Sequence, residues 1–307
     1  MQRYARGMSN GGVVQSRGTD PLSNHELKAV VPSLFATEAH ESRSHRFVPI
    51  PTITVLDGLR REGFEPFFAQ QARTRVAGKA EFTKHMVRLR HRGLRNDRDE
   101  AFEVILLNAN DGTAAYNLIP GFFRFVCANG LFAGESFETV KVRHSGNAVD
   151  EVIEGTCRVL DEAPALIDAR NQMVGTSLST GEAEAFARAA HQLRFPGAYP
   201  SVQGETDHLT EDELAEAMEV KPAPIEPGDL LRLRRYEDRS ANRNLWTVFN
   251  TVQENAIKGG QTGWVTGRNG RRRRSTTREV RGIDQNTALN RALWTLAEEM
   301  QALKNAA

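Results

Sequence analysis

Two β-prone runs on either side of a tight turn limit the fold of this chain more than any other segment. Phe102–Leu107 is apolar and β-prone, and Thr113–Ile119 follows it after Asn110-Asp111-Gly112. An Asp-Gly pair between two such runs is a strong hairpin signal, because glycine supplies the positive φ that the turn requires. Upstream, Thr83–Arg92 alternates with the period of a strand. The sequence therefore predicts an antiparallel β-sheet in the middle of the chain.

A helix is expected directly after the third predicted strand. Apolar and polar residues there follow helical spacing behind Pro120-Gly121, and Asn129-Gly130 is typical of a helix end; the spaced residues are Phe122, Phe125, Val126 and Asn129. The expected order over Thr83–Asn129 is therefore β-β-β-α. A strand-rich middle followed by helices indicates an α+β fold and not an alternating βα fold.

Helical signals flank the strands on both sides. Short helices are expected between Leu22 and Val31 and over Val55–Glu62, and longer ones over Asn147–Gln172 and Gly181–Leu193. The last third of the chain has two apolar stripes at helical spacing, formed by Leu245, Phe249, Val252 and Ala256 and by Leu289, Leu293, Leu296 and Met300. These stripes predict a helical C-terminal region.

Composition divides the chain into four parts. Residues 1–20 are polar and Gly/Ser-rich, which predicts a flexible N-terminus, and residues 21–194 are expected to form the α+β core. Residues 195–227 read as an acidic, Pro-rich insert or linker, in which Thr210–Met218 offers one short helix. Residues 228–307 are the C-terminal helical region, with a basic loop over residues 258–281.

Charge is unevenly distributed in a chain whose formal net charge is only +1. Eight acids lie between Glu205 and Glu226, against one lysine, whereas basic residues dominate from Arg73 to Arg98 and again from Arg268 to Arg281. Such asymmetry bears on the choice of partner and not on the fold. A nucleic-acid hypothesis for this chain therefore depends on where the charge lies.

Cysteine content and hydropathy favour a cytoplasmic protein. The two cysteines, Cys127 and Cys157, are too few for a disulfide framework or a four-cysteine metal site. The N-terminus has no apolar signal-peptide core, and no run approaches the ~18 apolar residues of a membrane helix.

The basic loop is the clearest candidate binding site. It carries seven arginines against one acid, Glu279, on a Gly-studded connection between two predicted helices. Each arginine can neutralise a phosphate and release a counterion, and Trp264 could stack on a base, which is worth ~1–3 kcal/mol. The alternatives are a solvated loop and a contact for an acidic protein. The candidate nucleic-acid-binding residues are Lys258, Trp264, Arg268, Arg271, Arg272, Arg273, Arg274 and Arg278.

A second basic surface is expected on the strand Thr83–Arg92. Alternation places its basic residues on one face and His85, Val87, Leu89 and His91 on the other. The basic residues could line a groove that follows a nucleic-acid backbone; they are Lys84, Arg88, Arg90 and Arg92. The alternative is an exposed edge strand that charge protects from aggregation.

No segment carries a clear catalytic signature. His40 and His45 are five residues apart, so they do not share a helix face as a metalloprotease pair does. Cys127 lies among aromatic residues and reads as a buried structural thiol. Asp57 and Glu62 could pair as acid and base, but helix-surface charges commonly do so. We assign no catalytic residue, metal or cofactor, and a non-catalytic protein is favoured.

Several blocks together resemble a known family. These are Ile50–Phe64, Thr83–Arg90, Asp111–Thr113, Gly121–Leu131 and Leu245–Asn255. In this order they resemble the plasmid- and prophage-encoded YfjQ/YubP/YafZ type, the domain of unknown function 932. The resemblance runs from about Leu22 to the carboxyl end and departs mainly in the acidic insert. It implies a context, namely prophages and conjugative plasmids, often near genes that act early on incoming single-stranded DNA.

Three functional hypotheses follow. The first is a mobile-element protein that binds single-stranded DNA, and promotes annealing, during plasmid or phage DNA establishment. The β-β-β-α order prompts a distant likeness to the Rad52/Redβ-type annealing fold, which would imply a homo-oligomer. No membrane partner is expected, because no run is apolar enough to form a membrane helix. The second is an interaction or counter-defence protein that binds a host factor. The third is a nuclease or other enzyme, which would turn over DNA in a metal-dependent way.

Overall fold

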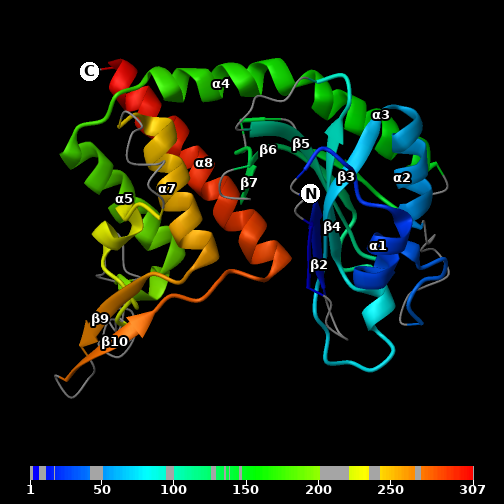
Figure 1. The fold of residues 1–307 in the computed structure, drawn as a ribbon, viewed down its shortest axis with the longest axis horizontal. Coiled ribbons are helices and arrows are strands. Elements are labelled where there is room, and N and C mark those ends of the chain that lie inside the picture. Colours follow the sequence, from blue (N-terminus) through cyan, green and yellow to red (C-terminus); the bar gives the residue numbers. More distant parts are fainter. Residues whose placement is uncertain are drawn as a thin grey trace, which may run out of the picture. The chain divides into compact units, whose positions relative to one another are not determined.

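The computed structural model describes residues 3–6, 12–16, 18–41, 51–94, 100–125, 129–134, 136–137, 139–144, 147–200, 221–234, 243–266 and 271–306 (Figure 1). The strands are β1 (Arg3–Arg6), β2 (Val13–Ser16), β3 (Phe64–Gln71), β4 (His85–His91), β5 (Glu100–Asn108), β6 (Tyr116–Arg124), β7 (Asn129–Phe132), β8 (Val140–Val142), β9 (Thr262–Thr266) and β10 (Arg272–Thr276). The α-helices are α1 (Asn24–Val30), α2 (Thr52–Arg61), α3 (Ala148–Asp161), α4 (Ala163–Gly175), α5 (Thr180–Arg194), α7 (Leu245–Lys258) and α8 (Ile283–Ala306). Short 3₁₀ helices are η1 (Pro32–Phe35), η2 (Ala80–Phe82), η3 (Pro196–Ala198) and η4 (Pro227–Leu231).

The chain forms two compact units, Met1–Asp168 with Gly282–Thr287 and Ala169–Arg281 with Ala288–Ala307. The first contains an antiparallel sheet in the order β1-β2-β3-β4-β5-β6-β7, with β8 paired to β6. The predicted hairpin is confirmed, since Leu107 pairs with Asn117 and Gly112 has a φ of 71°. The fold is therefore α+β, with an antiparallel sheet and a helical C-terminal region.

The helix expected over Phe122–Asn129 is wrong. β6 continues through Phe122 and Phe123, which pair with Phe102 and Ala101 of β5 on one side. On the other side they pair with Leu131 and Gly130 of β7. This apolar run is compatible with the spacing of a helix and with that of a strand. It forms a strand because backbone hydrogen bonds to two neighbouring strands stabilise that conformation. The first helix after the strands is α3, so the β-β-β-α order does not hold over Thr83–Asn129.

The N-terminal residues also differ from expectation. A flexible segment is predicted over residues 1–20, whereas Val13–Gln15 of β2 pair with Phe68–Gln70 of β3. The side chains of Gln15 and Ser16 are buried. A polar sequence can join a sheet because the ladder hydrogen bonds come from the backbone and not from the side chains.

Helices α1, α2 and α3 cover one face of the sheet (Figure 1). Ser23 and Glu26 form a capping box at the start of α1, which lies where the sequence predicts a short helix. A Cβ on Gly155 of α3 would lie 2.7 Å from Cγ1 of Val140, so glycine allows this helix to approach the sheet closely. The predicted helix at Val55–Glu62 is present, and it begins earlier, at Thr52.

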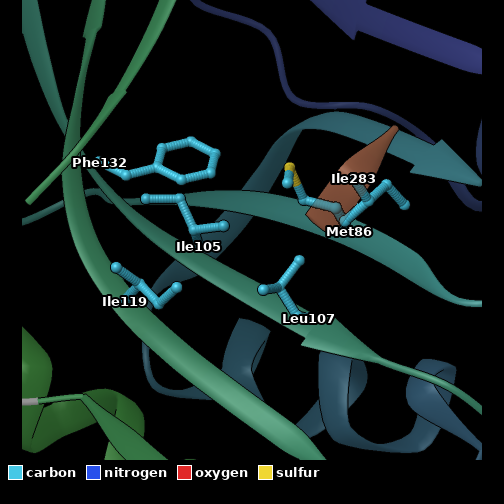
Figure 2. Packing of buried hydrophobic residues seen from close by; sticks show 6 residues of the cluster. All are labelled: Met86, Ile105, Leu107, Ile119, Phe132 and Ile283. Atoms are coloured by element: carbon cyan, nitrogen blue, oxygen red, sulfur yellow. The ribbon is translucent and has the colours of Figure 1, made fainter. Parts of the chain in front are cut away.

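The opposite face of the sheet carries an apolar cluster of Met86, Ile105, Leu107, Ile119, Phe132 and Ile283. Figure 2 shows these side chains gathered together, with Ile283 reaching them from the start of α8. The cross-strand register explains the cluster, because Met86 lies opposite Leu107 and Ile105 opposite Ile119. Arg88 stands on this same face, opposite Ile105.

The second unit is helical around an aromatic centre. The rings of Trp246 and Phe249 in α7 and Trp294 in α8 lie 5.5–6.1 Å apart, and the predicted stripe of α7 is buried. A two-stranded ribbon of β9 and β10 follows α7 and extends away from it (Figure 1). This ribbon occupies the segment in which the sequence predicts the basic loop.

Candidate nucleic-acid interface

The basic loop contains a β-hairpin. β9 and β10 pair antiparallel, with Trp264 opposite Arg274 and Thr266 opposite Arg272. Residues directly opposite each other, and residues two apart on one strand, share a face of the ribbon. Trp264, Arg272 and Arg274 therefore share one face, and Val265 and Arg273 lie on the other.

Trp264 is exposed on this ribbon. Its side chain is 57% exposed, and the guanidinium carbon of Arg272 lies 5.7 Å from the centroid of its ring. Arg271, Arg273 and Arg274 are exposed as well. On the other face Val265 is buried, which orients the ribbon so that the indole faces solvent. The face formed by Trp264, Arg272 and Arg274 is called the Trp264 face below.

The base of the hairpin is held by backbone hydrogen bonds. The Gly260 amide donates to the Thr277 carbonyl at 2.8 Å, and the Thr277 amide donates to the Gln261 carbonyl at 2.9 Å. Gly259 has a φ of 63°, and a Cβ there would lie 2.5 Å from the Arg278 carbonyl carbon. Only glycine therefore allows the chain to leave α7 in this direction.

The remaining predicted residues of the loop differ in their surroundings. Lys258 pairs with Glu254 at 3.3 Å on α7. Arg278 is exposed, and its carbonyl accepts a hydrogen bond from Arg194 at 2.9 Å. Arg268 lies outside the described residues.

The expected basic face on β4 is wrong for Arg88 and Arg90. Both residues are only 4% exposed, and both pair with Glu103 of β5, at 3.0 and 2.9 Å. Their guanidinium groups also lie over the rings of Phe68 and Phe67, at 4.3 and 4.1 Å. The alternating pattern is real, but the strand is buried on both faces, so these two charges lie in the interior.

The other two basic residues of that strand face already have protein partners. Lys84 donates to both carboxylate oxygens of Asp284, at 2.6 and 2.8 Å. Arg92 is exposed, and its Nη2 donates to the Arg60 carbonyl at 3.0 Å. The structure does not bring Lys84, Arg88, Arg90 and Arg92 together as an open groove.

A buried polar cluster lies in the first unit. Thr52 Oγ1 is 2.8 Å from His85 Nε2 and accepts from Asn108 Nδ2 at 3.0 Å, and His144 Nε2 is 2.9 Å from Asn108 Oδ1. Burial lowers the pKa of His85 to about 4 and raises the pKa of Tyr116, which contacts Thr52 at 3.3 Å. These groups hydrogen-bond to one another, which is the usual arrangement of buried polar side chains.

The metal-site, thiol and acid–base hypotheses find no support in the geometry of the described residues. His40 packs its ring against Phe82, whereas His45 and Cys127 lie outside the described residues. Asp57 pairs with Arg60 at 2.9 Å. Burial raises the pKa of the Cys157 thiol, which disfavours a reactive thiolate. Across the described ranges, no group of three or more His, Cys, Asp or Glu side chains is arranged to hold a metal ion.

Sequence reasoning missed three arginines at the base of the hairpin. Arg194 Nε donates to the Ala256 carbonyl at 2.9 Å, Arg232 Nη1 to the Thr262 carbonyl at 3.0 Å, and Arg234 Nη2 to the Gly259 carbonyl. The alternation of Leu and Arg in Leu231-Arg232-Leu233-Arg234 is the signal that could have drawn attention to two of them. Nothing in the local sequence marks Arg194.

Comparisons with known proteins agree on one family. The family model described as Domain of unknown function (DUF932) matches residues 39–294. The UPF0380 protein YafZ of Escherichia coli (strain K12) is 45% identical over 280 residues, which cover 91% of this chain and 92% of that protein. The UPF0380 protein YfjQ of the same strain is 44% identical over 280 residues, with the same coverage. No solved structure matches the chain. Among the described helices, none has the length and apolar character needed to cross a membrane.

Proposed function

Because this chain belongs to the DUF932 family, whose description names no activity, we propose its function from the hairpin: it binds single-stranded nucleic acid, with single-stranded DNA favoured, and acts without catalysis. The proposed setting is the establishment of plasmid or phage DNA.

The exposed Trp264 face carries the proposal. An indole can stack on any base, whereas arginines beside it neutralise the flanking phosphates. Trp264 and the guanidinium of Arg272 are already in contact at 5.7 Å, and Arg274 lies directly opposite on the ribbon. A base within a duplex has both faces covered by its neighbours, so this arrangement favours an unpaired strand.

Annealing is the further step that we propose for this activity. The likeness to the Rad52/Redβ-type fold was prompted by a strand-to-helix order that β6 and β7 do not follow. The proposal of annealing therefore rests only on the proposed binding of a single strand by the hairpin. The buried Arg88 and Arg90 are not part of the proposed interface, nor is Lys84, whose ammonium is bound by Asp284.

Salt titration of oligonucleotide binding tests the proposal. Each phosphate contact on a single strand contributes about −0.7 to the slope of log affinity against log salt. Replacing Arg271, Arg272, Arg273 and Arg274 with Ala should therefore flatten the slope by at least about 1.4 units, the combined contribution of Arg272 and Arg274 on the Trp264 face. The loss should be similar for all sequences, because phosphate contacts carry no base information. Trp264→Ala should weaken binding with little change in slope, since stacking releases no counterions.

Two controls make the titration decisive. Arg188→Ala removes an exposed arginine from α5 and should leave the slope unchanged. The urea midpoint of the four-alanine variant should stay near that of the wild type, because exposed substitutions usually change stability by less than about 0.5 kcal/mol each. An unchanged slope in the four-alanine variant would overturn the proposal.

The same hairpin supports a second candidate, an interaction protein that binds an acidic host factor. An exposed tryptophan beside arginines has the composition of a protein-binding hot spot. Capture from host lysate after nuclease treatment separates the two functions. A stoichiometric protein partner that survives nuclease and is lost in Trp264→Ala would favour this second function.

A further inference from the structure

The segment after η4 lies along the open edge of the hairpin. The Gln261 carbonyl accepts from the Thr277 amide across the ribbon, so the next carbonyl, that of Thr262, points away from β10. Arg232 Nη1 donates to this carbonyl at 3.0 Å. The guanidinium of Arg232 therefore lies beside β9, two residues before Trp264.

Arg232 keeps donors available to a ligand. Its side chain is 58% exposed, whereas the carboxylate of Asp229, which it pairs with at 2.6 Å, belongs to a side chain that is only 12% exposed. The contacts with Thr262 and Asp229 use two of the guanidinium N–H groups, and a fork of this kind can bind a phosphate with the others. Leu233 and Arg234, which follow, are exposed as well.

A buried amide fixes this segment to the hairpin. Asn255 Nδ2 donates to the Leu230 and Arg232 carbonyls, at 2.7 and 2.9 Å. Its Oδ1 accepts from Arg234 Nε at 2.6 Å and from Gln261 Nε2 at the hairpin base. Asn255 is 1% exposed, and these bonds use both its donors and both acceptor positions. The segment and the ribbon are therefore held by one side chain.

We propose that the nucleic-acid interface continues from the Trp264 face onto Arg232, and that Asn255 is the residue that positions the two parts for one strand. This inference rests on the proposed function. Two residues of a β-strand span about 7 Å, which is close to the combined rise of two nucleotides at ~3.4 Å each. A strand that stacks a base on Trp264 thus brings a phosphate to Arg232. Holding both contacts in place before binding lowers the ordering cost.

Oligothymidylates of two lengths test the extension. For a strand of about 16 nucleotides, Arg232→Ala should flatten the salt slope by about 0.7, and for a dinucleotide, too short to reach Arg232 from a base held at Trp264, it should change little. Arg232→Lys should restore most of the slope, because the charge returns. Arg188→Ala is the matched control and should change neither length.

The positioning role of Asn255 has a separate readout. Asn255→Ala should weaken binding of the long strand several-fold and leave the short strand unchanged, because the contacts remain but are no longer held together. Gln261→Ala removes only the hairpin side of this connection, so it keeps the test valid where Asn255→Ala fails to fold. Equal weakening of both lengths by Gln261→Ala would assign a purely structural role.

The outcomes separate the two proposals. A wild-type protein that binds neither oligothymidylate would overturn the proposed function and this inference with it. A wild type that binds, loses binding in the four-alanine variant, and is unaffected by Arg232→Ala would overturn the inference alone.

Discussion

At the scale of single residues, Glu103 is the carboxylate shared by two buried guanidinium groups. Arg88 and Arg90 pair with it at 3.0 and 2.9 Å, and both lie within 5.0 Å of the ring centroid of Phe123. We predict that Glu103→Gln lowers the free energy of unfolding by about 3–5 kcal/mol, because it leaves buried charges uncompensated. Urea denaturation measures this. Glu184→Gln, on the exposed surface of α5, is the control and should change stability by less than about 0.5 kcal/mol. A Glu103→Gln variant as stable as the wild type would mean that the surrounding phenyl rings alone compensate the two buried charges.

His85 supplies a pH prediction at the same scale. Burial holds its folded pKa near 4, below the 6.5 of an exposed histidine, so between these values the unfolded chain binds more protons. Stability should therefore fall as pH drops from 6.5 towards 4, by at most about 3 kcal/mol from this group. His85→Gln removes the titration. Its unfolding free energy should lose about 2–3 kcal/mol less than that of the wild type between pH 7 and pH 4.5. Equal losses in both proteins would contradict the assignment.

At the scale of elements, the hairpin depends on the backbone of Gly259. Its φ of 63° and ψ of −156° are open almost only to glycine, and a Cβ would meet the Arg278 carbonyl carbon at 2.5 Å. We predict that Gly259→Ala costs about 2–3 kcal/mol and speeds amide exchange at Gly260 and Thr277. Gly181→Ala, in α5 with open space around it, should instead stabilise by up to about 1 kcal/mol. Unchanged exchange at Gly260 in Gly259→Ala would show that the ribbon does not need this turn.

At the scale of the whole molecule, annealing sets a requirement on stoichiometry. Pairing two strands requires that both be held at once, and each copy presents one Trp264 face among the described residues. We therefore predict that light scattering with single-stranded DNA shows complexes containing at least two chains. A monomer at every concentration, with and without DNA, would remove annealing but leave single-strand binding intact.

The basic loop shows how much of a candidate site can be predicted from the sequence. Its arginines and Trp264 are evident from composition, and the structure exposes Trp264 and Arg271–Arg274. The hairpin was missed because Arg272–Thr276 has little β-propensity, although Asn269-Gly270 after the β-prone Trp264–Thr266 is a hairpin signal. Arg232 was missed for a related reason. Its place beside Thr262 depends on Asn255, which lies more than twenty residues away.

The sequence by itself determined what depends on neighbours along the chain. The capping box of α1, the turn at Gly112 and the stripe of α7 follow from residues within one or two turns of each other. Only the tertiary structure decided which strand faces are buried and where charges meet. Arg88 is an interior cation because Glu103 and Phe68, on two other strands, pack against its guanidinium group. Phe122 lies in a strand because β5 and β7 pair with it on either side. Whether a residue is buried or paired depends on the segments that pack against it, and these segments lie far away in the sequence. The residues next to it in the chain therefore do not determine its environment.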